Sequence, residues 1–138
     1  MAFELQQQGK QAALTKLLGA WLADLRVFLY TAKGGVAGSR GWADMTEATF
    51  TGYAAQGYAG AGPAMDGNAN AQYSGTTLTF TRGAGAGTET ILGWGVVTAD
   101  HSILLGIQDL PTPVVINTAG QTITVTANMY LGLLPPPY

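Results

Sequence analysis

The stretch of residues 121–134, near the end of the chain, alternates with a period of two and limits what the chain can fold into. Apolar side chains fall on one side of this stretch, while threonine, asparagine and tyrosine fall on the other. Strict alternation is typical of a β-strand that is buried on one face. Its outer face carries no Lys or Glu, the usual residues of a solvated surface. We therefore expect a strand whose uncharged face meets another protein.

Charged residues are scarce throughout the chain. They make up 10% of its 138 residues, whereas typical soluble domains contain about 25%. From residue 90 onward the only charged side chains are Asp100 and Asp109. Such a surface is poorly protected against association, so we expect much of it to be buried between subunits. The formal net charge of -2 gives no basis for a nucleic-acid partner, which usually needs a basic face.

Several classes of protein are made improbable by what the sequence lacks. It contains no cysteine, so we expect neither disulfides nor thiolate chemistry, in keeping with synthesis in a reducing cytoplasm. Residues 1–10 do not combine a basic region with an apolar core, so no signal peptide is expected. No apolar run approaches the roughly 20 residues of a membrane helix, so no membrane partner is expected.

The periodicity predicts one helix followed by short strands. Residues 6–22 are predicted to be helical because Leu14, Leu17, Leu18 and Trp21 form one apolar stripe. This helix either packs on the side of the domain or forms an arm that docks on a neighbouring subunit. A further helical turn is predicted within residues 44–50. Strands are predicted at residues 24–31, 51–59, 76–82, 89–98, 102–110, 113–116 and 121–134.

Together these elements predict a mainly β fold, a single β-sandwich of the jelly-roll or Ig-like kind with seven to eight strands. We expect an N-terminal arm and helix at residues 1–23, the sandwich at 24–134 and a Pro-rich tail at 135–138. The Gly- and Asn-rich residues 60–75 are expected to form a long surface loop. The tail is expected either to be disordered or to lie on a neighbouring subunit.

The residue types of a catalytic triad occur consecutively as Asp100, His101 and Ser102. Neighbouring residues point in different directions, whereas a triad needs side chains that converge from separate segments. His101 is the only histidine, so no other arrangement can use imidazole as a base. We expect an ordinary turn here and no catalytic residues, and we predict that the protein is not an enzyme.

No metal or cofactor site is predicted either. Asp66, Asn68 and Asn70 resemble the beginning of a calcium loop, but the downstream acidic ligand is missing. The glycine-rich residues 83–87 lack the Lys and Ser or Thr that complete a phosphate-binding loop. We expect a polar turn and a flexible turn at these two places.

The large aromatic residues are the best candidates for contacts with other proteins, because such residues are enriched at interface hot spots. Trp42 lies in a polar, Gly-rich loop and is either an exposed anchor or part of a small satellite core. Trp94 stands between two glycines, which allow a ring or a backbone to approach closely. The interface candidates are Trp21, Trp42, Tyr53, Tyr58, Tyr130 and Tyr138.

The order of segments resembles a known group of proteins. ALTKLLGAWL is followed by DLRVFLYT, TEATFTGYA, LTFTRGAGAGTETILGWGVV and AGQTITVTANMYLGL. This order is similar to that of small bacteriophage structural proteins with β-sandwich domains, over residues 14 to 134. None of these motifs is a catalytic signature, so no functional residue carries over. The loop at residues 60–75 and the Pro-rich end depart from the pattern.

The resemblance implies a role in the virion, on the capsid surface. Decoration or cement proteins bind the major capsid protein and brace the shell, commonly as homotrimers, which would use uncharged contact surfaces. The alternative is a component of the tail, baseplate or head fibre that contacts a host surface or a glycan through Trp42 and residues 60–75. Copy number on the particle separates the two hypotheses.

Overall fold

The computed structural model describes residues 24–58, 64–65, 71–73, 75 and 77–131. The predicted helix at residues 6–22 and the Pro-rich tail lie outside the described residues. So does most of the predicted loop at residues 60–75. The described part of the chain is mainly β, with antiparallel pairing throughout, so the predicted fold class is confirmed at this level.

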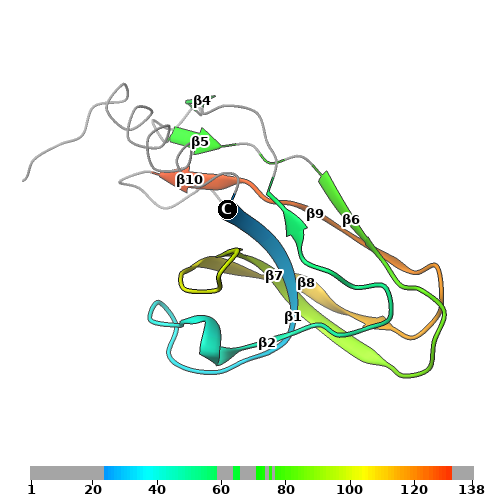
Figure 1. The fold of residues 1–138 in the computed structure, drawn as a ribbon. Helices are drawn as coiled ribbons and strands as arrows, with labels where there is room; N and C mark the ends of the chain where they lie inside the picture. The colour runs from blue at the N-terminus through cyan, green and yellow to red at the C-terminus, as the bar shows by residue number, and fades with distance from the viewer. Residues whose placement is uncertain (1–23, 59–63, 66–70, 74, 76, 132–138) are drawn as a thin grey trace, which may run out of the picture.

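A five-stranded antiparallel sheet forms the centre of the fold (Figure 1). Its strands are β1 (Leu25–Lys33), β2 (Met45–Glu47), β3 (Gln56–Gly57), β7 (Glu89–Thr98) and β8 (Leu104–Ile116). The order is β2-β1-β7-β8, and β3 also pairs with β1. A short 3-10 helix, η2 (Trp42–Asp44), precedes β2.

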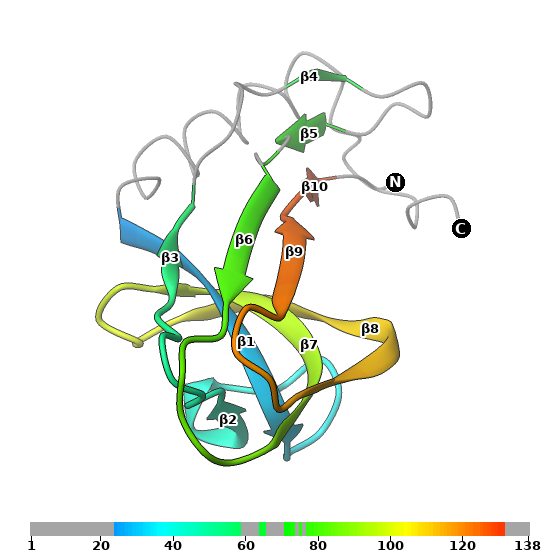
Figure 2. The same cartoon turned by 90° about the vertical axis from the view of Figure 1, so that its right-hand side faces the viewer.

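Two smaller antiparallel units complete the described structure. The strands β6 (Thr77–Thr81) and β9 (Thr122–Thr126) form a two-stranded ribbon, which Figure 2 shows side by side. A three-stranded sheet has the order β10-β5-β4 and consists of β10 (Met129–Leu131), β5 (Ala71–Tyr73) and β4 (Ala64–Met65). Because β9 and β10 are consecutive along the chain, the ribbon leads directly into this sheet.

Strand β1, which the sequence predicts as a strand, is buried on both of its faces. Leu25, Val27 and Leu29 are fully buried and pack in a cluster with Phe80 of β6 and Ile123 of β9. This cluster joins the ribbon to one face of the five-stranded sheet. Burying an apolar side chain of this size stabilises a fold by about 1.5–3 kcal/mol, so the cluster is the main link between the two units.

The opposite face of β1 carries a second cluster, built around two aromatic rings. Phe28 and Tyr30 are fully buried and pack with Met45 of β2 and Val97 of β7. Trp42 is half-buried at the margin of this cluster. The second cluster therefore occupies the face of the sheet that the ribbon does not cover.

The rings of the second cluster lie over the two glycines that flank Trp94. Tyr30 pairs with Gly93 and Phe28 pairs with Gly95 across β1 and β7. A Cβ atom on Gly95 would lie 2.8 Å from the Phe28 ring and 2.7 Å from the carbonyl oxygen of Gly106. A Cβ atom on Gly93 would overlap the Tyr30 hydroxyl. The structure confirms the predicted close approach of a ring: Tyr30 lies against Gly93 and Phe28 lies against Gly95.

Several predicted boundaries are wrong. The predicted helical turn at residues 44–50 is replaced by η2 and β2, and the predicted strand at 51–59 is reduced to β3. The last strand is divided into β9 and β10. Leu104–Ile116 form one 13-residue strand, β8, where two strands were predicted at residues 102–110 and 113–116. Between the pairs Ile91–Val114 and Gly93–Asp109 the register shifts, so the two prolines of β8 lie in a bulge where no ladder donor is needed.

Replacing Gly95 by alanine is expected to lower the free energy of unfolding by about 1–3 kcal/mol, because the added carbon overpacks a full core. The matched control is Gly106→Ala on the neighbouring strand, where a Cβ would meet no described atom within 4 Å. We expect that control to stay within about 0.5 kcal/mol of the wild type. Urea unfolding of the three proteins measures both values, and equal losses would contradict the role given to the rings.

Candidate interaction surfaces

The outer face of the β6–β9 ribbon is a ladder of threonines. Three cross-strand pairs face each other, and all six threonines are exposed; the pairs are Thr77–Thr126, Thr79–Thr124 and Thr81–Thr122. The hydroxyl oxygens of the first pair lie 2.7 Å apart. Directly opposed β-branched residues stabilise an antiparallel pair by a few tenths of a kcal/mol to about 1 kcal/mol. The uncharged face predicted for the last strand is therefore present over Thr122–Thr126, and β6 doubles its width.

The predicted interface residues are placed in different surroundings. Trp42 is half-buried, with its ring centroid 5.0 Å from that of Phe28 and 4.5 Å from that of His101. Trp42 therefore closes the margin of the second cluster. The sequence leaves two alternatives open for Trp42, an exposed anchor or part of a satellite core, and this position is that of a satellite core. Trp21 and Tyr138 lie outside the described residues, and Tyr130 lies in β10.

Tyr53 and Tyr58 contribute to the fold of the chain itself. Tyr58 is 6% exposed, and its hydroxyl donates to the carbonyl oxygen of Ala127 at 2.7 Å. The Tyr53 hydroxyl donates to Glu47 at 2.7 Å and accepts a hydrogen bond from the backbone N–H of Leu29 at 3.1 Å. Burial raises the pKa of Tyr53 well above its usual value, so the phenol stays protonated. These two tyrosines join loops to β1 and β9, and we propose no interface role for them.

The consecutive Asp100, His101 and Ser102 form a turn, as predicted. One carboxylate oxygen of Asp100 accepts hydrogen bonds from the Thr98 hydroxyl at 2.7 Å and from the Ser102 hydroxyl at 2.7 Å. It also accepts the backbone N–H of Ser102 at 3.0 Å. His101 has a φ of 62° and its ring lies against Trp42. The serine hydroxyl is therefore oriented by the aspartate and not by the histidine.

A polar cluster that the sequence did not reveal connects β1 and β8. The Tyr30 hydroxyl and the Lys33 ammonium group both donate to the carboxylate of Asp109, each at 2.5 Å. The hydrogen bond from Lys33, followed by the one from Tyr30, lowers the pKa of Asp109. Burial is the main reason why the pKa of Tyr30 is raised. Tyr30 and Lys33 lie 79 and 76 positions before Asp109 in the sequence, and the pairing of β7 with both β1 and β8 brings the three residues together.

The glycine-rich turn at residues 83–87 is held by Arg82, which is 2% exposed. One terminal nitrogen of its guanidinium donates to the carbonyl oxygens of Gly85 at 2.9 Å and Gly87 at 3.0 Å. The turn is thus organised around a side chain of its own chain. An isolated arginine in a strand gives no signal of this role, so the sequence alone could not reveal it.

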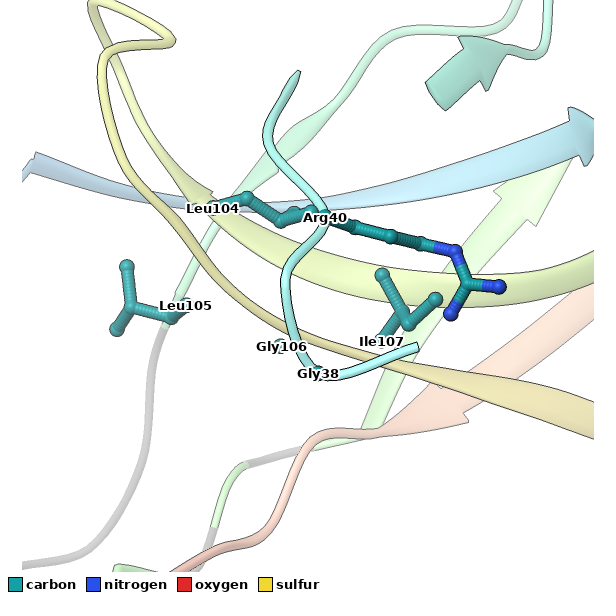
Figure 3. Close-up of a pocket in the computed structure, with 6 residues that line it drawn as sticks. All are labelled: Gly38, Arg40, Leu104, Leu105, Gly106 and Ile107. Carbon is teal, nitrogen blue, oxygen red and sulfur yellow. The ribbon is translucent and has the colours of Figure 1, made fainter. Parts of the chain in front are cut away.

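A pocket of about 280 Å³ lies beside β8 and is shown in Figure 3. It is lined by the loop residues Gly38 and Arg40 and by the first residues of β8, Leu104, Leu105, Gly106 and Ile107. The Arg40 side chain runs along the pocket (Figure 3). Its Nε atom donates to the carbonyl oxygen of Gly34 at 2.7 Å. The predicted interface residues do not include this pocket, because the loop and β8 are far apart in sequence.

The turn at Asp100 predicts a pH dependence of stability. Hydrogen bonds from Ser102, then from Thr98, lower the pKa of Asp100 from 3.8 to about 2. The folded pKa lies below the unfolded one, so the stabilisation is complete above about pH 4 and is lost as the pH falls towards 2. Thermal unfolding between pH 5 and pH 2 should therefore show a steeper decline for the wild type than for Asp100→Asn.

The control for this measurement is Asp24→Asn. The Asp24 side chain is exposed and makes no hydrogen bond within the part of the chain that the structure describes. We expect its acid unfolding profile to keep the wild-type slope over this pH range. A profile of Asp100→Asn that parallels the wild type would show that the turn does not depend on the carboxylate.

Comparison with known proteins yields no match: no family model matches the chain, and no curated protein or solved structure matches it significantly. Within the described residues no helix has the length and apolarity to cross a membrane. In the same residues no three His, Cys, Asp or Glu side chains are grouped so that they could hold a metal ion. The function has to be argued from the residues and the geometry of the chain itself.

Proposed function

We propose that this chain is a bacteriophage structural protein that decorates the capsid. In this role it is made in the host cytoplasm and binds the major capsid protein on the virion surface, where it braces the shell. The observation that carries the proposal is the exposed threonine face of the β6–β9 ribbon. That face is regular in shape and carries no charge. One of its two strands, β9, belongs to a segment whose sequence resembles the phage proteins.

Burying an uncharged face against a partner costs less free energy than burying a charged one. Charged side chains are depleted at the centre of protein interfaces, because their desolvation is only partly repaid. A threonine exposes a methyl group and a hydroxyl, so it can be buried against apolar groups or can hydrogen-bond to a partner. Six such residues in paired rows offer a contact area that requires no ion to be desolvated. A low charge content over the last third of the chain supports the same role.

The proposal includes a particular architecture and assembly. The ribbon packs its apolar side on the five-stranded sheet through Phe80, Ile123 and Leu29, and we propose that these layers make up a small β-sandwich of the jelly-roll or Ig-like kind. We also propose that copies associate as homotrimers on the shell, because closed symmetric assembly is the usual outcome for a subunit with such a surface.

Imaging of labelled protein on particles of the encoding phage tests the function directly. Many copies distributed over the shell are the expected result. A few copies confined to the tail or to a single vertex would overturn the decoration role, and would favour the tail, baseplate or head-fibre alternative. Particles assembled without the protein should also be less stable to heating, since a cement protein stabilises the shell that it binds.

A charge-neutral pair of substitutions tests the threonine face. Thr79→Lys together with Thr124→Glu places opposite charges directly across the ribbon, so the monomer should keep its stability within about 0.5 kcal/mol. Attachment to particles that lack the protein should weaken by about tenfold or more, because two ions must now be desolvated. Co-sedimentation with the particles measures the attachment.

The matched control places the same two charges elsewhere. Thr90→Lys with Val115→Glu also forms a directly opposed and exposed pair, across β7 and β8. We expect this variant to attach to particles as well as the wild type does. Equal loss of attachment in both variants would show a general effect of charge, and unchanged attachment of the ribbon variant would contradict the proposed contact face.

A further inference from the structure

Gly106 of β8 is a glycine that the described fold does not require. Its backbone does not adopt a positive φ, and a Cβ atom built on it would meet no described atom within 4 Å. This contrasts with Gly93 and Gly95, whose missing side chains make room for Tyr30 and Phe28. A glycine within a strand weakens it unless something approaches closely at that point. At Gly106 nothing in the described chain does.

Hollows flank Gly106 on both faces of the sheet. The pocket of about 280 Å³ lies on the face of Leu104 and Ile107, which belong to the second cluster. A second pocket of about 160 Å³ is lined by Trp94, Val96 and Leu105, which belong to the cluster beneath the ribbon, and also by Gly106. The two pockets share Leu105, Gly106 and Ile107 and otherwise draw on the two different clusters, so they lie on either side of the same stretch of β8.

Strand β8 is the last strand in the sheet order and pairs with β7 alone among the described elements. Edge strands are usually protected by prolines, by lysines or by bulges. In β8 the prolines stand at positions 111 and 113 and a register shift lies at Leu104–Gly106, whereas Gly106–Asp109 contain neither proline nor lysine and keep a regular register with β7. An unprotected edge with pockets for alternate side chains is the arrangement that binds an extended peptide as an added strand.

The charges around the larger pocket indicate the chemistry of its occupant. Arg40 is half-buried, and its terminal nitrogens make no hydrogen bond within the described residues. Lys33 and Asp109 already form an ion pair, and Arg40 is the only charged side chain among the described residues that line the pocket. The other pocket is faced by Trp94 and Leu105 and is apolar in character.

We propose that β8 binds an extended acidic segment of another protein, which adds a strand to the edge of the five-stranded sheet at residues 104–110. Successive residues of an extended chain point to opposite faces. One carboxylate of the segment therefore pairs with Arg40, and the adjacent apolar residue packs against Trp94 and Leu105. In the proposed capsid role this segment belongs to the major capsid protein, and that identification alone rests on the proposed function.

A second copy of this chain is a poorer occupant of the same edge. Pairing two β8 edges would bring together two cationic pockets, each with its own Arg40. The carboxylate of β8 itself, Asp109, is already held by Tyr30 and Lys33 at 2.5 Å. Neither edge would supply the unpaired carboxylate that Arg40 lacks. The charges thus favour a partner with an acidic strand.

The test uses the full chain labelled with ¹⁵N and three synthetic peptides, acetyl-Thr-Val-Glu-Val-Thr-amide and its counterparts with Gln or Lys in the centre. We expect the Glu peptide to shift the amide resonances of residues 104–110 in a saturable way, with a Kd of about 1 mM. The Gln peptide should bind about tenfold more weakly, because one charge-assisted hydrogen bond is lost. The Lys peptide should not bind.

Two variants complete the test. Arg40→Gln should weaken binding of the Glu peptide about tenfold. Its matched control Arg26→Gln, on β1 beside Gly57 and away from the pocket, should not. Gly106→Val should abolish binding while the protein keeps its unfolding midpoint, since the fold leaves open space there. The proposal is overturned by an absence of saturable shifts, by shifts centred on β6 and β9, or by equal affinity of the Glu and Lys peptides. Because no particle is involved, failure here leaves the decoration role separately testable.

Discussion

The described fold depends on the burial of β1 on both faces. Leu25, Val27 and Leu29 connect the sheet to the ribbon, while Phe28 and Tyr30 fill the opposite side. A strand can be buried in this way only when its neighbour leaves room, and Gly93 and Gly95 of β7 provide that room. The positions of β2, β8 and the loop that carries Arg40 all follow from this central pair of strands. The same constraint explains why β7 is rich in glycine yet remains a regular strand.

The pattern of the sequence predicted the elements whose burial follows a simple period. The alternation of β9, the presence of strand β1 and the close approach of a ring at Gly93 and Gly95 could all be predicted, because each depends on neighbouring residues. The extent of β8 could not, since it depends on a bulge that removes Pro111 and Pro113 from the ladder. The helical turn expected after Asp44 also failed, because pairing of β2 with β1 overrides a weak local capping signal.

The candidate surfaces were predictable to different degrees. The threonine face follows from the period of the last strand, and only its second row, on β6, required the structure. The aromatic residues were poor guides, since Tyr58 and Tyr53 are used inside the fold. The pocket at Arg40 and the cluster at Asp109 combine segments about 65 or more residues apart. Composition and spacing contain no information on such contacts, which arise from sheet order alone.

The open surroundings of Gly106 have a consequence for how such a protein can diversify. Most positions on a central sheet are constrained by their neighbours, so a change of partner would normally disturb the fold. At Gly106 a Cβ atom would meet no described atom within 4 Å, and the same residue borders both pockets. If the edge of β8 binds a strand as proposed, a substitution at Gly106 changes which strands fit while the fold keeps its packing. At the edge of β8, related chains can therefore change their binding partner before they change their fold.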